Sequence, residues 1–125
     1  MNDMFKAIIL TILTSFLITL GQVFWKLGIQ KAGGFYMNET SIIQNIIRIV
    51  FNGYVFSGFV IYGIATFFFM YLISKFDVSF IIPLSSISYV FVLLAGAWVF
   101  KEEISIYRLL GVMVIILGVY LISKK

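Results

Sequence analysis

The sequence has no cysteine and no histidine among its 125 residues, and it has a single proline. The missing thiols exclude disulfides and thiolate chemistry, and the missing imidazoles remove the commonest nitrogen ligands of zinc. Charged residues make up only 11% of the chain, whereas 62% of the residues are hydrophobic. A soluble domain of this size needs a polar surface that so few charged residues do not supply. The sequence therefore predicts a membrane protein, and no cofactor or metal is expected.

Long uncharged runs predict four membrane-spanning helices. Residues 7–25, 49–74 and 78–100 contain no charged side chain, and a spanning helix needs roughly 20 predominantly apolar residues. The last run, residues 109–123, reaches spanning length if its helix begins near residue 104 and Arg108 extends from the first turn to the lipid headgroups. We predict an all-α membrane protein that forms a single domain over residues 1–125. Its helices are expected at residues 4–30, 54–76, 78–100 and 104–123.

A short amphipathic segment is expected between the first two spans, over about residues 41–51. Thr40 or Ser41 is placed to cap it. Its polar side would carry Gln44, Asn45 and Arg48. The segment either lies at the membrane interface or extends the second span beyond the membrane.

Lysine and arginine are divided almost evenly between the two predicted membrane faces. With alternating loops, one face carries Lys6, Lys75, Lys124 and Lys125. The other face carries Lys26, Lys31, Arg48, Lys101 and Arg108. Orientation normally follows an excess of these residues on the cytoplasmic side. Four against five gives no clear excess, so the sequence predicts a weakly determined orientation, with insertion in either direction or orientation set by a partner.

Gln22 and Lys26 form a polar pair near the end of the first span. They lie four residues apart and share a helix face, with Trp25 nearby. Amide and ammonium groups at the mouth of an internal cavity can hold an anionic group such as phosphate. Alternatively, Lys26 extends from the helix end to the interface, and Trp25 belongs to the aromatic belt.

Three hydroxyls follow the proline of the third span. Pro83 lacks a backbone donor and frees a carbonyl, so we expect a kink there. Ser85, Ser86 and Ser88 come directly after it. Beside a kink they would line a cavity; otherwise they bond to carbonyls of the preceding turn or pack against another helix.

Two glycines in the last span, Gly111 and Gly118, lie one heptad apart on one helix face. Such a pair allows another helix to approach closely. That helix belongs either to the same chain or to a second subunit across a dimer seam.

Taken together, these features resemble the drug/metabolite transporter superfamily in its four-helix form. The resemblance is strongest in the C-terminal half, in residues 83–89, in Phe100-Lys101-Glu102-Glu103-Ile104-Ser105, and in Gly111 and Gly118. EamA-type domains have a similar aromatic-x-Glu-x-aliphatic-Ser turn between their last two helices. Glu102 occupies the glutamate position of that turn, although by composition alone it lies in a solvated loop.

The small multidrug resistance proteins are similar in length, and their last helix carries a glycine pair that matches Gly111 and Gly118. In that family this segment is the seam of an antiparallel dimer, which agrees with the even division of charge. Their essential glutamate falls on Ile18 here, and their aromatic cage positions fall near Ile82 and Ser85. The first three spans also contain no Asp or Glu away from their ends. The proton carrier and the cation-π surface of that mechanism are therefore missing.

A closer resemblance is to the subunits of the undecaprenyl-phosphate aminoarabinose flippase. Those subunits share the Gly-Gln-x-x-x-Lys pattern of Gly21, Gln22 and Lys26, a stretch similar to residues 83–90, and the turn at Glu102. The resemblance implies a flippase that translocates a polyprenyl-phosphate-linked sugar across the cytoplasmic membrane. It would act by alternating access, as a homodimer or with a related four-helix subunit.

The site implied by this resemblance includes Gln22, Trp25, Lys26, Tyr62, Ser85, Ser86 and Glu102. Lys26 and Gln22 would hold the phosphate, and the hydroxyl-bearing residues would meet the sugar. Two alternatives remain: an exporter of a small soluble metabolite, which needs a cavity sealed from lipid, and a non-transporting accessory subunit. No nucleophile–base pair indicates an enzyme, and the scattered basic residues form no nucleic-acid footprint.

Overall fold

The computed structural model describes residues 3–34 and 42–124, and every regular element within them is helical. The predicted caps Thr40 and Ser41, and the terminal Lys125, lie outside the described residues. Four helical segments are long and apolar enough to cross a membrane: α1 (Asp3–Lys31), α3 (Gly53–Lys75), the interrupted span Val78–Trp98, and α6 (Ile106–Ser123). The predicted all-α class with four spanning helices is confirmed.

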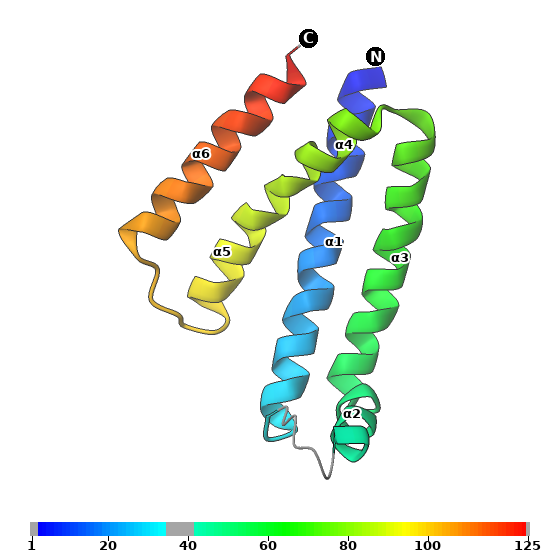
Figure 1. The fold of residues 1–125 in the computed structure, drawn as a ribbon, viewed down its shortest axis with the longest axis vertical. Helices are drawn as coiled ribbons and strands as arrows, with labels where there is room; N and C mark the ends of the chain where they lie inside the picture. The colour runs from blue at the N-terminus through cyan, green and yellow to red at the C-terminus, as the bar shows by residue number, and fades with distance from the viewer. Residues whose placement is uncertain (1–2, 35–41, 125) are drawn as a thin grey trace.

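Helices α1 and α3 lie side by side over most of their length (Figure 1) and make the most extensive helix contact in the described chain. Two glycines make this possible. A Cβ at Gly58 would lie 2.6 Å from the carbonyl oxygen of Gly21, and a Cβ at Gly21 would lie 2.9 Å from that of Gly58. Helices in lipid gain little from the hydrophobic effect, so such close packing is what holds the pair together.

The third span, predicted as one helix over residues 78–100, is divided into α4 (Val78–Leu84), a 3₁₀ turn η1 (Ser85–Ile87) and α5 (Ser88–Trp98). Pro83 lies inside α4, where its ring and missing amide disturb the regular hydrogen-bond pattern. The hydroxyls of Ser85 and Ser86 each donate to a carbonyl three residues earlier, at 2.6 Å. Where the sequence predicted a kink, the structure has a tighter helical turn directly after Pro83, and serine hydroxyls stabilise it.

Helix α6 stands to one side of the other helices (Figure 1), where it contacts α4 and η1. It begins at Ile106 because the hydroxyl of Ser105 caps it, accepting a hydrogen bond from the amide of Arg108 at 3.2 Å. None of its residues is buried. A Cβ at Gly111 or Gly118 would meet no described atom within 4 Å, so neither glycine serves packing within the described part of this chain.

The amphipathic segment forms a separate helix, α2 (Ile42–Val50). Asn52 ends any continuity with α3, because its side chain accepts hydrogen bonds from the first amides of that helix. Arg48 of α2 donates to the carbonyls of Ala32 and Gly34, just beyond the end of α1. The segment is therefore a helix of its own, tied to the end of α1, rather than an extension of α3.

Candidate functional site

A line of polar side chains follows one face of α1, toward the interrupted span. Its members are Thr11, Ser15, Thr19, Gln22 and Lys26, spaced by three or four residues. The three hydroxyl-bearing residues are buried. The hydroxyl of Ser15 donates to the carbonyl of Ser85 at 3.3 Å. That of Thr19 donates to the carbonyl of Ser15 at 3.0 Å and lies 3.5 Å from the carbonyl of Ser88. This polar face thus supplies donors to the carbonyls around η1.

Lys26 is paired with Glu102, with 2.5 Å between Nζ and Oε2. The same Nζ lies 4.6 Å from the centre of the Phe100 ring, which is a cation–π geometry. Phe100 and Glu102 belong to the link between α5 and α6, so the pair joins that link to α1. The two charged side chains are 48% and 38% exposed. A ligand can therefore reach them.

The local backbone explains why Glu102 lies beside Lys26. Lys101 adopts a left-handed conformation with a φ of 54°, which turns the chain back after α5. The amide of Glu102 then donates to the carbonyl of Gly96 at 2.9 Å. Gly96 also leaves room for the carboxylate, because a Cβ there would lie 2.7 Å from Oε1 of Glu102.

The environment keeps Glu102 ionised. The hydrogen bond from Lys26 is the main cause that lowers the pKa of this carboxyl, followed by the charge of Lys26 and, more weakly, that of Arg108. Hydrogen bonds and positive charges both favour the charged form of a carboxyl group. Glu102 is therefore a carboxylate at neutral pH.

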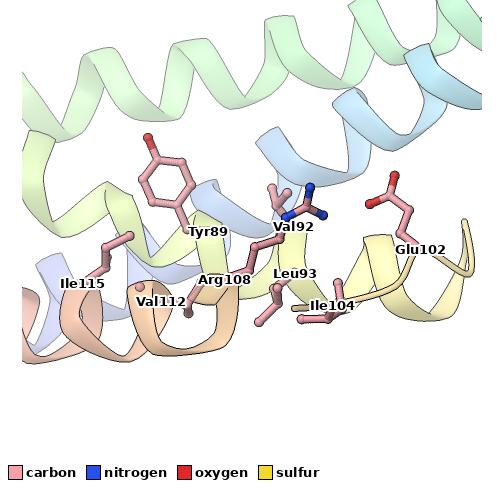
Figure 2. Close-up of a pocket in the computed structure, with 9 residues that line it drawn as sticks. Tyr89, Val92, Leu93, Glu102, Ile104, Arg108, Val112 and Ile115 are labelled. Carbon is pink, nitrogen blue, oxygen red and sulfur yellow. The ribbon is translucent and has the colours of Figure 1, made fainter. Parts of the chain in front are cut away.

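Two hollows meet at Glu102. One, of about 210 Å³, lies between α1 and α5 and is lined by Gln22 and Lys26. The other, of about 400 Å³, lies between α5 and α6 and is lined by Tyr89 and Arg108 among aliphatic side chains. Figure 2 shows Arg108 reaching from α6 past Val92, with the carboxylate of Glu102 on the same side of α5. Val92 and Glu102 line both hollows, which makes them two parts of one site.

The structure distributes the predicted site residues over three places. Gln22, Lys26 and Glu102 come together in the hollow between α1 and α5. Trp25 and Tyr62 stack on each other, with 5.0 Å between ring centres, where α1 meets α3. Ser85 and Ser86 lie at η1, with their hydroxyls bonded to the preceding turn.

Trp25 turns away from the hollow because it is one residue from Lys26, about 100° around the helix. It fills the space beside Gly58, where a Cβ would lie 2.6 Å from the indole Cδ1. Its indole Nε1 is buried and has no hydrogen-bond partner among the described residues. In this conformation Trp25 therefore packs the two helices together rather than lining the site.

Sequence reasoning missed Tyr89 and Arg108 as site residues, and it missed the buried part of the polar face. The hydroxyls of Thr11, Ser15 and Thr19 continue the face of Gln22 and Lys26 at helical spacing, so that signal was available. Arg108 gave no such signal, since a basic residue near a helix end also suits an interfacial position.

Comparison with known families gives one match. The profile of the EamA-like transporter family matches residues 39–124. The matched region takes in α2, α3, the interrupted span and α6, together with Glu102 and Arg108, whereas α1 and Lys26 lie outside it. Comparisons with curated proteins and with solved structures returned no match.

Proposed function

The chain belongs to the EamA-like transporter family, and on this premise we propose that it moves a polyprenyl-phosphate-linked sugar across the cytoplasmic membrane. Family membership and the four apolar helices make it a multi-pass membrane transporter of the drug/metabolite type. The observation that carries the proposal for the substrate is the accessible Lys26–Glu102 pair between two hollows, the larger of which has mostly aliphatic walls. A lipid-linked phosphate needs this combination of a cation and apolar surface.

Lys26 binds the phosphate in this proposal. Its ammonium is a compact charge with three donors, and Gln22 adds an amide one turn earlier on the same face. The carboxylate of Glu102 already bonds to this ammonium at 2.5 Å. A phosphate oxygen is an anionic acceptor of the same kind, so it can share the ammonium with Glu102 or exchange with it.

The sugar would follow the polar face of α1 toward η1. There its hydroxyls can exchange with the hydrogen bond that Ser15 donates to the carbonyl of Ser85, and the carbonyl of Ser88 lies near Thr19. Carbonyls of Ser85 and Ser88 at this break are acceptors for a polyhydroxyl compound. Trp25 and Tyr62 lie outside this path, since they pack between α1 and α3. The isoprenoid chain stays in lipid beside the aliphatic walls.

Two subunits complete the transporter in this proposal, and they pack through α6. The absence of buried residues in α6 supports this, as does the open position of Gly118; Gly111 is also open, but it lines the larger hollow. The even division of Lys and Arg between the faces is compatible with opposite orientations of the two subunits. The second subunit is another copy of this chain or a related four-helix protein.

Native mass spectrometry of the detergent-purified protein tests the proposal. The protein is offered an undecaprenyl-phosphate-linked sugar together with ordinary phospholipids, and Lys26→Ala is compared with Lys31→Ala. Lys31 is a matched control, because it lies on the same helix over the ring of Tyr54 and lines neither hollow. We expect a dimer that retains the polyprenyl lipid, with retention about tenfold or more lower in Lys26→Ala only, as for a lost hydrogen bond to a charged group.

Three outcomes would contradict parts of the proposal. Equal retention in Lys26→Ala and in the wild type would reject Lys26 as the phosphate ligand. A dimer that does not discriminate polyprenyl lipid from phospholipid would favour an exporter of a small soluble metabolite. A strict monomer would favour an accessory subunit.

A further inference from the structure

Arg108 is a charged residue of the site to which the proposed function assigns no role. It lies in the first turn of α6, and its side chain lines the larger hollow together with Glu102 and Tyr89. Figure 2 shows its guanidinium on the side of α5 to which the carboxylate of Glu102 also points. Its charge is one of the causes that lower the pKa of Glu102, which is further evidence that the two groups are near each other.

In the described part of the chain, three charged side chains line the two hollows and set their net charge. Of the described residues that line them, Lys26, Arg108 and Glu102 are the charged ones. Lys26 and Arg108 each contribute one positive charge, and the ionised Glu102 contributes one negative charge. The site therefore has a net charge of +1, which a bound anion with a single negative charge would balance.

We propose that Arg108 is a second ligand of the substrate phosphate, and that the charge balance of Lys26, Arg108 and Glu102 selects a singly charged phosphodiester headgroup. This inference rests on the proposed function, and it adds the charge class of the headgroup. A sugar joined through one phosphate to a lipid is a phosphodiester with a single negative charge, which neutralises the site. A phosphate monoester, with a charge of about −1.5 to −2 at neutral pH, leaves excess negative charge. A diphosphate linkage, with at least two negative charges, also leaves excess negative charge in the site.

Glu102 is the specificity-determining residue in this arrangement. Lys26 and Arg108 attract any phosphate, and an arginine fork can bind two of its oxygens at once. Glu102 opposes the second negative charge of a monoester or diphosphate. The substitution Glu102→Gln keeps the size of the side chain but raises the net charge of the site to +2, so it should transfer the preference to doubly charged headgroups.

The experiment measures competitive lipid retention by the full-length protein in native mass spectrometry. Three lipids share one undecaprenyl chain: a glycosyl phosphodiester, the phosphate monoester and the diphosphate. In the wild type we expect the phosphodiester to be retained about tenfold over the other two. Glu102→Gln should reverse this order. Arg108→Gln should lower the retention of all three lipids by about tenfold or more, with the larger loss for the monoester and the diphosphate, because it lowers the net charge of the site to zero.

Glu103→Gln is the matched control, because Glu103 is the adjacent carboxylate and lines neither hollow. It should retain the wild-type order of headgroups. If Glu102→Gln also retains that order, the charge-balance inference is wrong. If Arg108→Gln retains all three lipids as well as the wild type does, Arg108 is not a phosphate ligand.

Two glycerolipids separate this inference from the proposed function. Phosphatidylglycerol is a phosphodiester and phosphatidic acid is a monoester, and neither has an isoprenoid chain. If polyprenyl lipids and glycerolipids of the same headgroup are retained equally, and Glu102→Gln reverses the headgroup order in both, the charge match is supported and the polyprenyl substrate is rejected. If polyprenyl lipids are preferred but Glu102→Gln leaves the headgroup order unchanged, the proposed substrate is supported and the charge match is rejected.

Discussion

Gly58→Ala should weaken the fold by overfilling the contact between α1 and α3. The added Cβ would lie 2.6 Å from the carbonyl oxygen of Gly21 and 2.6 Å from Cδ1 of Trp25. Carbon contacts are optimal at about 3.5–4.0 Å, so the helices must separate by roughly 1 Å near this point. The carbonyl belongs to the backbone and cannot rotate away as a flexible side chain would.

The expected size follows from two opposing effects. Overpacking costs about 1–3 kcal/mol, whereas replacing glycine by alanine inside a helix gains about 0.5–1 kcal/mol. We therefore expect Gly58→Ala to lower the free energy of unfolding by up to about 2.5 kcal/mol, with a central value of about 1 kcal/mol. Gly63→Ala is the matched control in the same helix, because a Cβ there would meet nothing within 4 Å. It should leave stability unchanged or raise it by up to about 1 kcal/mol.

Reversible unfolding in mixed micelles, followed by circular dichroism, measures both variants under the same conditions. With Trp98 replaced by Phe in both variants, the fluorescence of Trp25 adds a local probe, since its ring packs at 5.0 Å from Phe59 and from Tyr62 in this contact. The argument fails if Gly58→Ala is as stable as Gly63→Ala and the indole emission does not shift.

Two further predictions concern Glu102. Its folded-state pKa is lowered, so the stability it contributes is present above the unfolded pKa and is lost only as pH falls through the folded value. The infrared band of the Glu102 carboxylate can be isolated as the difference between the spectra of the wild type and Glu102→Gln. This band should persist below about pH 4.3, where a free glutamate titrates. In Lys26→Ala the same band should disappear at a higher pH. Gly96→Ala should also raise the pH of this titration, since the added Cβ would lie 2.7 Å from Oε1 of Glu102 and push the carboxylate away. The free energy of unfolding should change by no more than about 0.5 kcal/mol, because only the mobile end of a side chain has to move. An unchanged titration in Gly96→Ala would show that the carboxylate does not depend on this glycine.

The sequence was sufficient for the spans and for the break in the third one, because both depend on local properties. A run of uncharged residues of bilayer length has few alternatives to a spanning helix, and Pro83 disturbs its own turn whatever surrounds it. The helix ends were harder to place. Because Ser105 caps α6, the helix begins at Ile106, two residues later than the predicted start at residue 104, and this depends on where the preceding loop leads.

The site was less predictable, because it depends on which faces of the helices meet. Gln22 and Lys26 were found by their spacing, but the spacing does not say that Trp25 turns to α3 while Lys26 turns to α5. Glu102 reaches Lys26 across 76 positions of sequence, through the left-handed Lys101 and the space above Gly96. Such a contact is a product of tertiary packing, and a single sequence contains no local sign of it.

The length of α1 and the spacing of its lysines can be compared with the thickness of the bilayer. Its 29 residues span roughly 43 Å at about 1.5 Å per residue, more than the roughly 30 Å of hydrocarbon. Lys6 and Lys26 are 20 positions apart, or about 30 Å along the helix axis. The spacing of the two lysines therefore matches the thickness of the hydrocarbon layer, and in that placement Lys26 would lie at one edge of it. For the substrate we propose, this depth would allow the lipid-linked anion to enter sideways within its own leaflet, with its headgroup near its resting depth and its chain never exposed to water.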